Sequence, residues 1–405
     1  MAALSARVKV WFGRVESQST VAAGLAMLVA WISSHNRSTN YNNYVRLADA
    51  WIHGHTWIEW PGRWLEAALY HGRYYTIPAP LPALFALPFV PYLHLHVNQT
   101  YIAILVCGGI VMTAYRLLGN LGVDLRGRVL LTLFLFAGTD LWWCSELGDV
   151  WFLAQLSAML FTFLALSEAL GKKRAVLVGL YAFCAFESRA ITLLAIPLYA
   201  WLLCKPNFET AFRPDARRLR ALALTLAGGA CVYVAYNLWQ WGVPYDIGFG
   251  LYYKQDSWGH PSGVPFALAY VPYQLYSYFI QAPVFVDNLQ QPIWPYFKAD
   301  PKGVALTFTS PALILAFFAR APRGFVRALW VTVAAFCVLE FTYYLNGWYQ
   351  FGMRHVLDFL PFLFVLMGLA VRDRLPAGGT ALILWSAAVG TWGVWYWNIF
   401  FRTGD

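Results

Sequence analysis

The sequence predicts an all-α polytopic membrane protein: a bundle of about eleven transmembrane helices, with interfacial helices in its first long polar loop. Hydrophobic residues make up 60% of the chain, only 12% of residues are charged, and the mean hydropathy is positive. This composition is typical of integral membrane proteins. The charged residues fall mainly between apolar runs, as expected when a charge inside the bilayer costs a few kcal/mol or more.

The apolar runs are joined by short, mostly basic connections. The first span lies near 20–34 and follows a basic segment without a clear cleavage site, so we expect a retained anchor rather than a signal peptide. Several runs are shorter than the ~20 residues that cross a bilayer upright, so their ends must use aromatic or polar flanks. The further spans are expected at 101–118, 129–140, 151–170, 175–187, 191–204, 221–239, 304–320, 328–346, 357–371 and 380–397.

The run 79–95 decides the predicted orientation. It contains four prolines, which break helices, so we interpret it as interfacial or re-entrant rather than spanning. Most of the 29 Lys and Arg residues then fall in short cytoplasmic loops, as the positive-inside rule requires. The chain, 1–405, is then one transmembrane domain with a cytoplasmic N-terminus and an external C-terminus. Its two long polar segments, 34–100 and 240–303, lie on the non-cytoplasmic face, where we expect the functional surface.

Several classes of function are disfavoured. The basic residues form no single dense patch, so the net charge of +9 does not indicate a nucleic-acid partner. The six cysteines form no metal-binding pattern. No P-loop, HExxH or GxSxG motif is present. We expect no cofactor and no dedicated metal site, although the acidic connection with Asp140, Glu146 and Asp149 leaves a divalent metal open.

Candidate catalytic residues lie in the first polar segment. Apolar residues recur at helical spacing through 40–53, and Asp49 lies on the opposite face, one turn from Arg46 and His53. This carboxylate is either a partner in an intrahelical ion pair or a general base held near a substrate. Glu66, in the turn-rich segment that follows, has the same two interpretations.

Candidate cations flank the same segment and a later span. Arg73 precedes an aromatic pair and the proline-rich run, where its planar donor fork could bind a lipid phosphate, or where it could simply snorkel to the interface. Arg189 lies at the outer end of a span beside Glu187. It could form a structural pair or meet a phosphate from within a cavity.

The later external segments add further polar candidates. Arg354 and His355 lie where a span re-enters the membrane, which suits a polyprenyl phosphate headgroup. Asp358 lies one helical turn after Arg354 and could instead neutralise it. In the segment 240–303, Asp246 and Lys254 are either substrate contacts or part of a solvated face.

Residues 20–130 resemble a known family. An anchor, a helix with the pattern YVRLADAWIHGHTWI, a GRYY element and a PAPLPALFALPF run are similar to the first extracytoplasmic loop of C-type (GT-C) glycosyltransferases. The likeness is greatest to the protein O-mannosyltransferase and lipid A aminoarabinose transferase branch. It implies a GT-C-like bundle that transfers a sugar with inversion from a polyprenyl-phosphate donor to a glycan, lipid or protein acceptor. It also implies a bacterial inner-membrane location with the active site facing the periplasm or exterior.

The resemblance assigns roles to the candidates and leaves one alternative. Enzymes of this family place a catalytic Asp about fourteen residues before the position of Gly54, but Asn40 stands there, and Asn cannot act as a base. Asp49 or Glu66 would then be the base. A lipid-linked sugar transporter or flippase is the alternative, and it would need polar residues through the bundle, where only Glu340 lies. Donor-phosphate ligands would be Arg73, Arg189, Arg354 and His355, and substrate contacts would be Asn40, Tyr44, His53, Arg63, Tyr75, Asp246 and Lys254.

Overall fold

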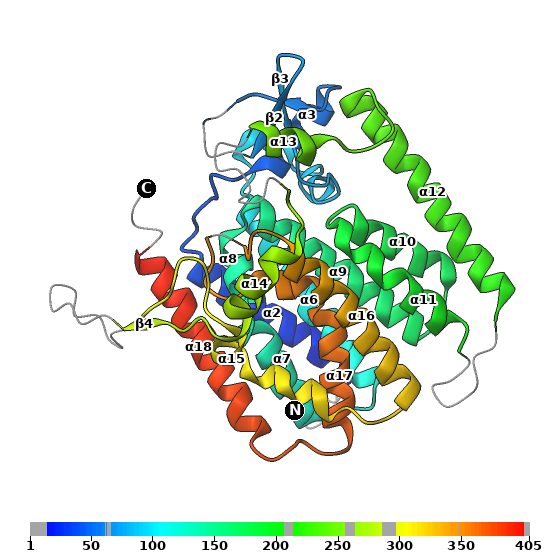
Figure 1. The fold of residues 1–405 in the computed structure, drawn as a ribbon, viewed down its shortest axis with the longest axis vertical. Coiled ribbons are helices and arrows are strands. Elements are labelled where there is room, and N and C mark those ends of the chain that lie inside the picture. Colours follow the sequence, from blue (N-terminus) through cyan, green and yellow to red (C-terminus); the bar gives the residue numbers. More distant parts are fainter. Residues whose placement is uncertain are drawn as a thin grey trace, which may run out of the picture. The chain divides into compact units, whose positions relative to one another are not determined.

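The computed structural model describes residues 14–60, 62, 66–205, 214–255, 264–285, 297–347 and 349–400. About 70% of the structure is helical, and its elements are shown in Figure 1. Internal contacts divide the chain into two compact units. The first comprises Met1–His35, Cys107–Trp143 and Pro265–Asp405, and the second comprises Asn36–Val106 and Cys144–Val264.

Several helices are long and apolar enough to cross a membrane. Five qualify individually among the described residues, and a sixth is formed if α7 (Leu125–Ala137) and α8 (Leu141–Leu147), bent by 48° at their break, make one span. These helices indicate an integral membrane protein. The five are α2 (Val15–Ser33), α6 (Gln99–Asn120), α9 (Val150–Leu170), α12 (Ala216–Trp241) and α16 (Arg323–Thr342).

The expectation of eleven spans is wrong, because several apolar runs form short or irregular helices. The run 191–204 is divided into η2 (Ala190–Ala195) and α11 (Ile196–Leu203), and the run 304–320 into α15 (Leu306–Thr309) and η4 (Pro311–Phe318). A proline near the start of α11 and of η4 supplies no backbone donor to an earlier turn.

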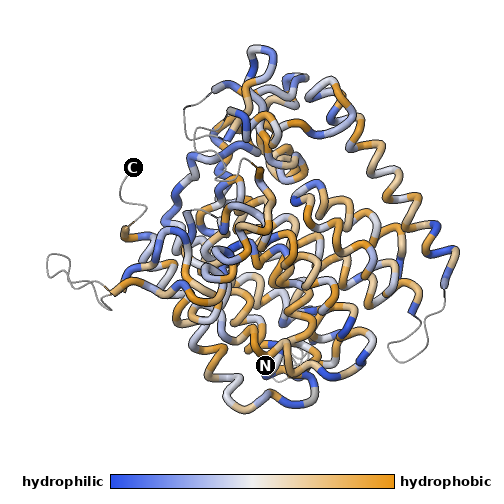
Figure 2. Tube along the Cα trace, viewed as in Figure 1, coloured by the Kyte–Doolittle hydropathy of each residue, from blue (hydrophilic) through white to orange (hydrophobic). Residues whose placement is uncertain are grey.

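Three other predicted spans also fall short of the five. The helices α10 (Ala175–Phe186) and α17 (Leu360–Asp373) have 12 and 14 residues. The last helix, α18 (Gly379–Phe400), has 22 residues, but its tryptophans and glycines lower its mean hydropathy below that of the five. Figure 2 shows that hydrophobic residues still follow these helices.

In the second unit, α10 packs against α9 and α12, while α11 packs against α9 and α12. Small residues permit this close packing. A Cβ on Gly229 of α12 would lie 2.5 Å from the ring of Phe183 on α10, and a Cβ on Gly179 would lie 2.9 Å from Thr225. Glycine at these two crossings therefore sets how closely α10 and α12 approach.

The first polar loop belongs to the same unit. The predicted helix at 40–53 is confirmed as α3 (Asn43–Ile52). The run 79–95 forms no continuous helix, as its prolines predict. It contains α4 (Ala83–Ala86), α5 (Val90–Leu93) and the start of η1 (His94–His96), and all three pack against α3.

The same loop also contains a small antiparallel sheet, which the all-α prediction missed. Its strand order is β1 (Trp57–Ile58), β3 (Arg73–Thr76), β2 (Ala67–Tyr70). The GRYY element is the start of β3, and Ala68 pairs with Tyr75. His71 and Gly72 have φ of 48° and 75°, the backbone of a two-residue hairpin turn. Helix α13 (Gly248–Gln255) packs against β2.

In the first unit, α17 packs against α7, α16 and η4, and α18 packs against α2, α7, α15 and η4. A Cβ on Gly390 of α18 would lie 1.9 Å from the carbonyl oxygen of Ala137, so only glycine fits at this crossing. The predicted loop 240–303 is shared between the units. Its later part contributes η3 (Leu268–Tyr270), α14 (Val271–Phe279) and the short hairpin of β4 (Val284–Phe285) and β5 (Phe297–Lys298).

Candidate functional site

Helix α3 is the element around which the polar residues of the second unit gather. Its N-terminus is held by Gln99, whose Oε1 accepts a hydrogen bond from the Tyr44 backbone at 3.1 Å. The Nε2 of the same side chain donates to the carbonyl oxygens of Tyr41 and Gly148, at 3.1 and 2.7 Å. One buried amide thus fixes where α3 begins relative to the start of α9.

Asp49 lies on α3 beside two imidazoles. Its Oδ1 is 3.4 Å from His94 Nδ1, and its Oδ2 is 3.7 Å from His53 Nδ1. The closer contact of His53 is to the Asp49 backbone carbonyl, at 2.8 Å. The Asp49 side chain is 20% exposed, and its Oδ1 is buried without a hydrogen bond to the described residues.

Of the two neighbours one turn from Asp49, His53 lies at ion-pair distance from its carboxylate, whereas Arg46 forms no ion pair with it. Arg46 Nε instead donates to Asn42 Oδ1 at 2.8 Å. The imidazole closest to the carboxylate comes from His94 in η1, which the sequence did not single out because it follows the proline-rich run, far along the chain. This arrangement leaves the Asp49 carboxylate with acceptor capacity for a ligand.

The opposite, buried side of α3 meets Glu66 and Arg189. Tyr44 is fully buried. Burial raises the pKa of its phenol, the charge of Arg189 lowers it, and the charge of Glu66 raises it, which places both charges near this side chain. Asn43 Nδ2 donates to the Glu66 carbonyl at 2.9 Å. The structure therefore brings together three predicted residues from three separate segments: Tyr44, Glu66 and Arg189.

Glu187 and Asp246 form a second carboxyl group pair in this unit. Glu187 is 7% exposed, and its Oε1 has no hydrogen bond to the described residues. Burial, and then the charge of Asp246, raises the pKa of Glu187 to about 7. Asp246 itself is exposed, and its Oδ1 accepts a hydrogen bond from the Gly248 backbone at 2.7 Å. From the sequence, Glu187 was considered only as an ion-pair partner of the nearby Arg189.

Asn40 is exposed, and the residue before it contacts an acid from a distant segment of the chain. The hydroxyl of the preceding Thr39 donates to Asp149 Oδ1, and its Oγ1 accepts from the Tyr41 backbone at 2.9 Å. A carboxylate therefore lies next to the position where the resemblance expects the catalytic Asp. No local pattern joins residues 39 and 149, so only the fold shows this contact.

The remaining predicted residues of this unit have other surroundings. Arg73 is exposed, and its guanidinium lies 5.0 Å from the centre of the Trp57 ring, a cation–π contact. Tyr75 is buried in the sheet, and its ring centre lies 5.1 Å from that of Trp241, with the two rings tilted by 44°. Lys254 is exposed on α13. Arg63 lies outside the described residues.

The two predicted phosphate ligands Arg354 and His355 belong to the first unit and are buried. Arg354 Nη2 donates to the Gly347 carbonyl at 2.7 Å and interacts electrostatically with Asp140. His355 Nδ1 lies 2.9 Å from Glu340 Oε2.

Metal ligands do not cluster among the described residues: no three of their His, Cys, Asp and Glu side chains form a group that could hold an ion. The chain is mostly helical, with several helices long and apolar enough to cross a membrane, and its second unit gathers carboxylates, imidazoles and arginines around α3. No protein-family model, curated protein or solved structure matches the chain.

Proposed function

We propose that this protein is an inverting glycosyltransferase that moves a sugar from a polyprenyl-phosphate donor to an acceptor hydroxyl on the non-cytoplasmic face of the membrane. The observation that carries the proposal is the pairing of functions on α3. Helix α3 carries a partly exposed carboxylate, Asp49, and a buried phenol, Tyr44, on which the charge of Arg189 acts. Transfer from a phosphate donor needs both a base and a positive charge.

Asp49 is the best candidate for the base. Its side chain is 20% exposed, which allows an acceptor hydroxyl to approach the carboxylate, while its buried Oδ1 lies 3.4 Å from His94 Nδ1. The carboxylate of Asp246 is occupied by the Gly248 backbone at 2.7 Å, and that of Asp149 by Thr39. Glu187 retains a proton near neutral pH because its pKa is raised to about 7. Glu66, near Arg189, is the second choice.

Arg189 is the proposed cation for the donor phosphate. It is half-buried, and a partly desolvated guanidinium binds phosphate through paired N–H donors more strongly than an exposed one. Arg73 is exposed at the start of the central strand β3, next to the hairpin turn, and could meet the phosphate from the solvent side. Arg354 and His355 already interact within their own buried cluster.

The reaction then proceeds as one displacement. Asp49 removes the proton from the acceptor hydroxyl while the hydroxyl oxygen forms a bond to the anomeric carbon of the sugar. The bond between that carbon and the phosphate oxygen breaks, and polyprenyl phosphate leaves with the electron pair. Attack from the face opposite to the leaving group inverts the anomeric configuration. His94, 3.4 Å from Asp49, can accept the proton afterwards.

Measuring sugar transfer and donor binding separately distinguishes a glycosyltransferase from a protein that only carries the lipid-linked sugar. The purified chain in proteoliposomes would receive radiolabelled polyprenyl-phosphate sugar and an acceptor extract. We expect Asp49→Asn to lower transfer about 10²- to 10⁴-fold, the usual contribution of a general base, with donor binding retained. Asp124→Asn is the matched control, since Asp124 only caps α7 through Gly127 at 2.7 Å and Asn caps equally well.

Two outcomes would contradict the proposal. If Asp49→Asn and Glu66→Gln both transfer label at the rate of the unmodified protein, neither acid is the base. If the label changes leaflet but reaches no acceptor, the chain is a carrier of lipid-linked sugars, and the same residues bind without catalysing.

A further inference from the structure

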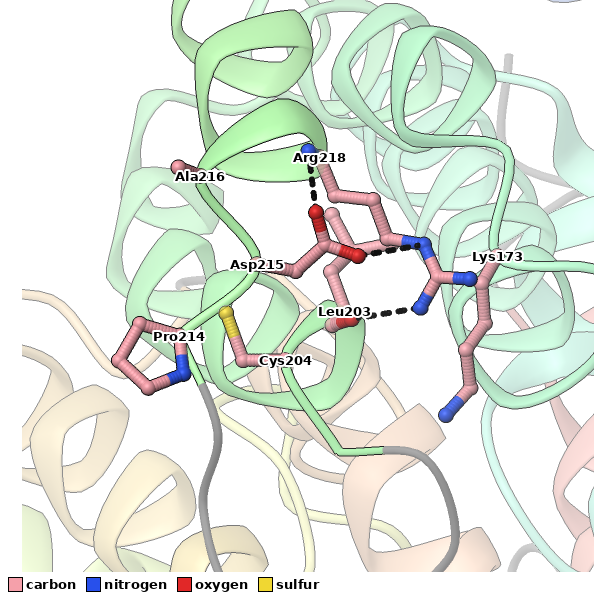
Figure 3. Close-up of a pocket in the computed structure, with 7 residues that line it drawn as sticks. All are labelled: Lys173, Leu203, Cys204, Pro214, Asp215, Ala216 and Arg218. Atoms are coloured by element: carbon pink, nitrogen blue, oxygen red, sulfur yellow. Dashed lines mark hydrogen bonds and ion pairs between the residues drawn. The ribbon is translucent and has the colours of Figure 1, made fainter.

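A cavity of about 540 Å³ lies at the far end of the second unit from the candidate site. It is formed where the turn between α9 and α10, the end of α11 and the start of α12 meet (Figure 3). The helix α10 separates it from Glu187, because α10 begins one residue after Arg174 and ends at Phe186. Twelve helical residues span about 18 Å, so this cavity is distinct from the site around α3.

Two cations line the cavity and are held in place. Arg218 Nη1 donates to the Leu203 carbonyl at 3.1 Å, and its Nε lies 3.4 Å from Asp215 Oδ2. Its other terminal nitrogen makes no hydrogen bond to the described residues, and Figure 3 shows the guanidinium next to Lys173. Lys173 Nζ donates to the Lys205 carbonyl. The backbone anchors therefore fix both side chains before any ligand arrives.

The surroundings of the cavity are positive. Burial and the charge of Arg218 lower the pKa of Lys173, which is the mark of two cations held close together. The carboxylate of Asp215 compensates only in part, because it also caps α12 by accepting from the Arg218 backbone at 3.0 Å. Arg174, in contrast, forms an ion pair with Glu168, in which Nη2 lies 2.7 Å from Oε2.

We propose that this cavity binds a phosphate group, supplied either by the headgroup of an anionic phospholipid or by free phosphate. A guanidinium with an unused N–H edge beside a lysine is the donor set that recognises phosphate oxygens. Basic pockets between the ends of membrane helices bind anionic headgroups in this way. The loops that form the cavity are rich in Lys and Arg, which the positive-inside rule associates with the cytoplasmic surface, where anionic lipids are available.

The test uses the full chain, purified in a neutral detergent and returned to nanodiscs of phosphatidylcholine with or without phosphatidylglycerol. The variant Lys173→Gln with Arg218→Gln removes both lining cations. The matched control, Lys172→Gln with Arg220→Gln, removes two exposed cations from the neighbouring positions. We expect the first pair to weaken phosphatidylglycerol retention roughly 10- to 30-fold, since each basic residue at a membrane surface contributes about 1 kcal/mol, and the control pair to have a much smaller effect.

A second variant keeps the test valid if the double variant folds poorly. Asp215→Asn removes the negative charge but keeps a good helix cap, so it should strengthen binding severalfold. Thermal unfolding in inorganic phosphate, compared with chloride at equal ionic strength, identifies the source of the bound phosphate group. Protection that depends on Lys173 and Arg218 assigns free phosphate. Retention of phosphatidylglycerol without such protection assigns the lipid headgroup. Equal losses in both pairs, or no gain from Asp215→Asn, would overturn the proposal.

Discussion

The variant Glu187→Gln tests whether the buried carboxyl group of Glu187, near Asp246, is uncharged at neutral pH. Gln has the shape of a protonated Glu and cannot ionise. The Glu187 side chain is nearly inaccessible to solvent, and its Oε1 lacks a donor among the described residues. The variant therefore preserves packing and removes only the ability to become charged.

The size of the effect follows from the raised pKa. A carboxyl with a pKa of about 7 in the folded state, against an ordinary value of 4.5, disfavours its charged form by about 3 kcal/mol. The folded state holds this proton more tightly than the unfolded state does. The free energy of unfolding therefore falls as pH rises from about 4.5 to about 7, and changes no further above that range. Gln removes this fall.

The assay is thermal unfolding in detergent between pH 4.5 and pH 8.5. Glu187→Gln should match the unmodified protein near pH 4.5 and exceed it at pH 8 by up to about 3 kcal/mol. Glu59 provides the control, since Glu59→Gln makes the same chemical change at an exposed position. A variant that is less stable than the unmodified protein at pH 8 would show that Glu187 is charged and engaged by a cation, and would refute the reasoning.

Three further results are expected. Arg189→Gln should weaken binding of the donor lipid on the order of tenfold or more while leaving the fold intact, as measured by retention of radiolabelled donor. His94→Gln should lower the transfer rate roughly tenfold without changing donor binding, because it affects only the proton on Asp49; an unchanged rate would exclude His94 from the reaction. Gly72→Ala should cost about 1 kcal/mol in thermal unfolding, because φ is 75° there, whereas Gly228→Ala, in open space on α12, should not destabilise.

Much of the fold could be predicted where one local rule decided the structure. The helical spacing of apolar residues predicted α3, and the four prolines of 79–95 predicted a broken run. Hydropathy indicated a membrane protein but not the number of spans, because it measures apolarity and not backbone geometry. The runs 191–204 and 304–320 are mostly apolar, yet each contains a proline at the start of a new helix.

The sheet of the first loop was missed for a related reason. Its strands have only two to four residues, too short for a period of two to be visible. The turn at His71 and Gly72 was the available signal, since a two-residue turn of this kind joins antiparallel strands.

The candidate site could be predicted only in part, because its contacts join distant segments. Sequence chemistry selected Asp49, Glu66 and Arg189, and the structure places the last two near Tyr44. The sequence alone could not reveal that His94 is the nearest imidazole to Asp49. Nor could it reveal that Asp149 lies beside Thr39, 110 residues earlier. Local spacing gives information only within one element.

The most direct test of the proposed site is an experimental structure of the protein with a non-transferable polyprenyl-phosphate sugar analogue bound. The proposed mechanism predicts that the phosphate contacts Arg189 and that the face of the anomeric carbon opposite the phosphate is turned toward the Asp49 carboxylate, with space for an acceptor hydroxyl between them. A donor bound against Arg354 and His355, with no carboxylate of the α3 site near its anomeric carbon, would contradict it.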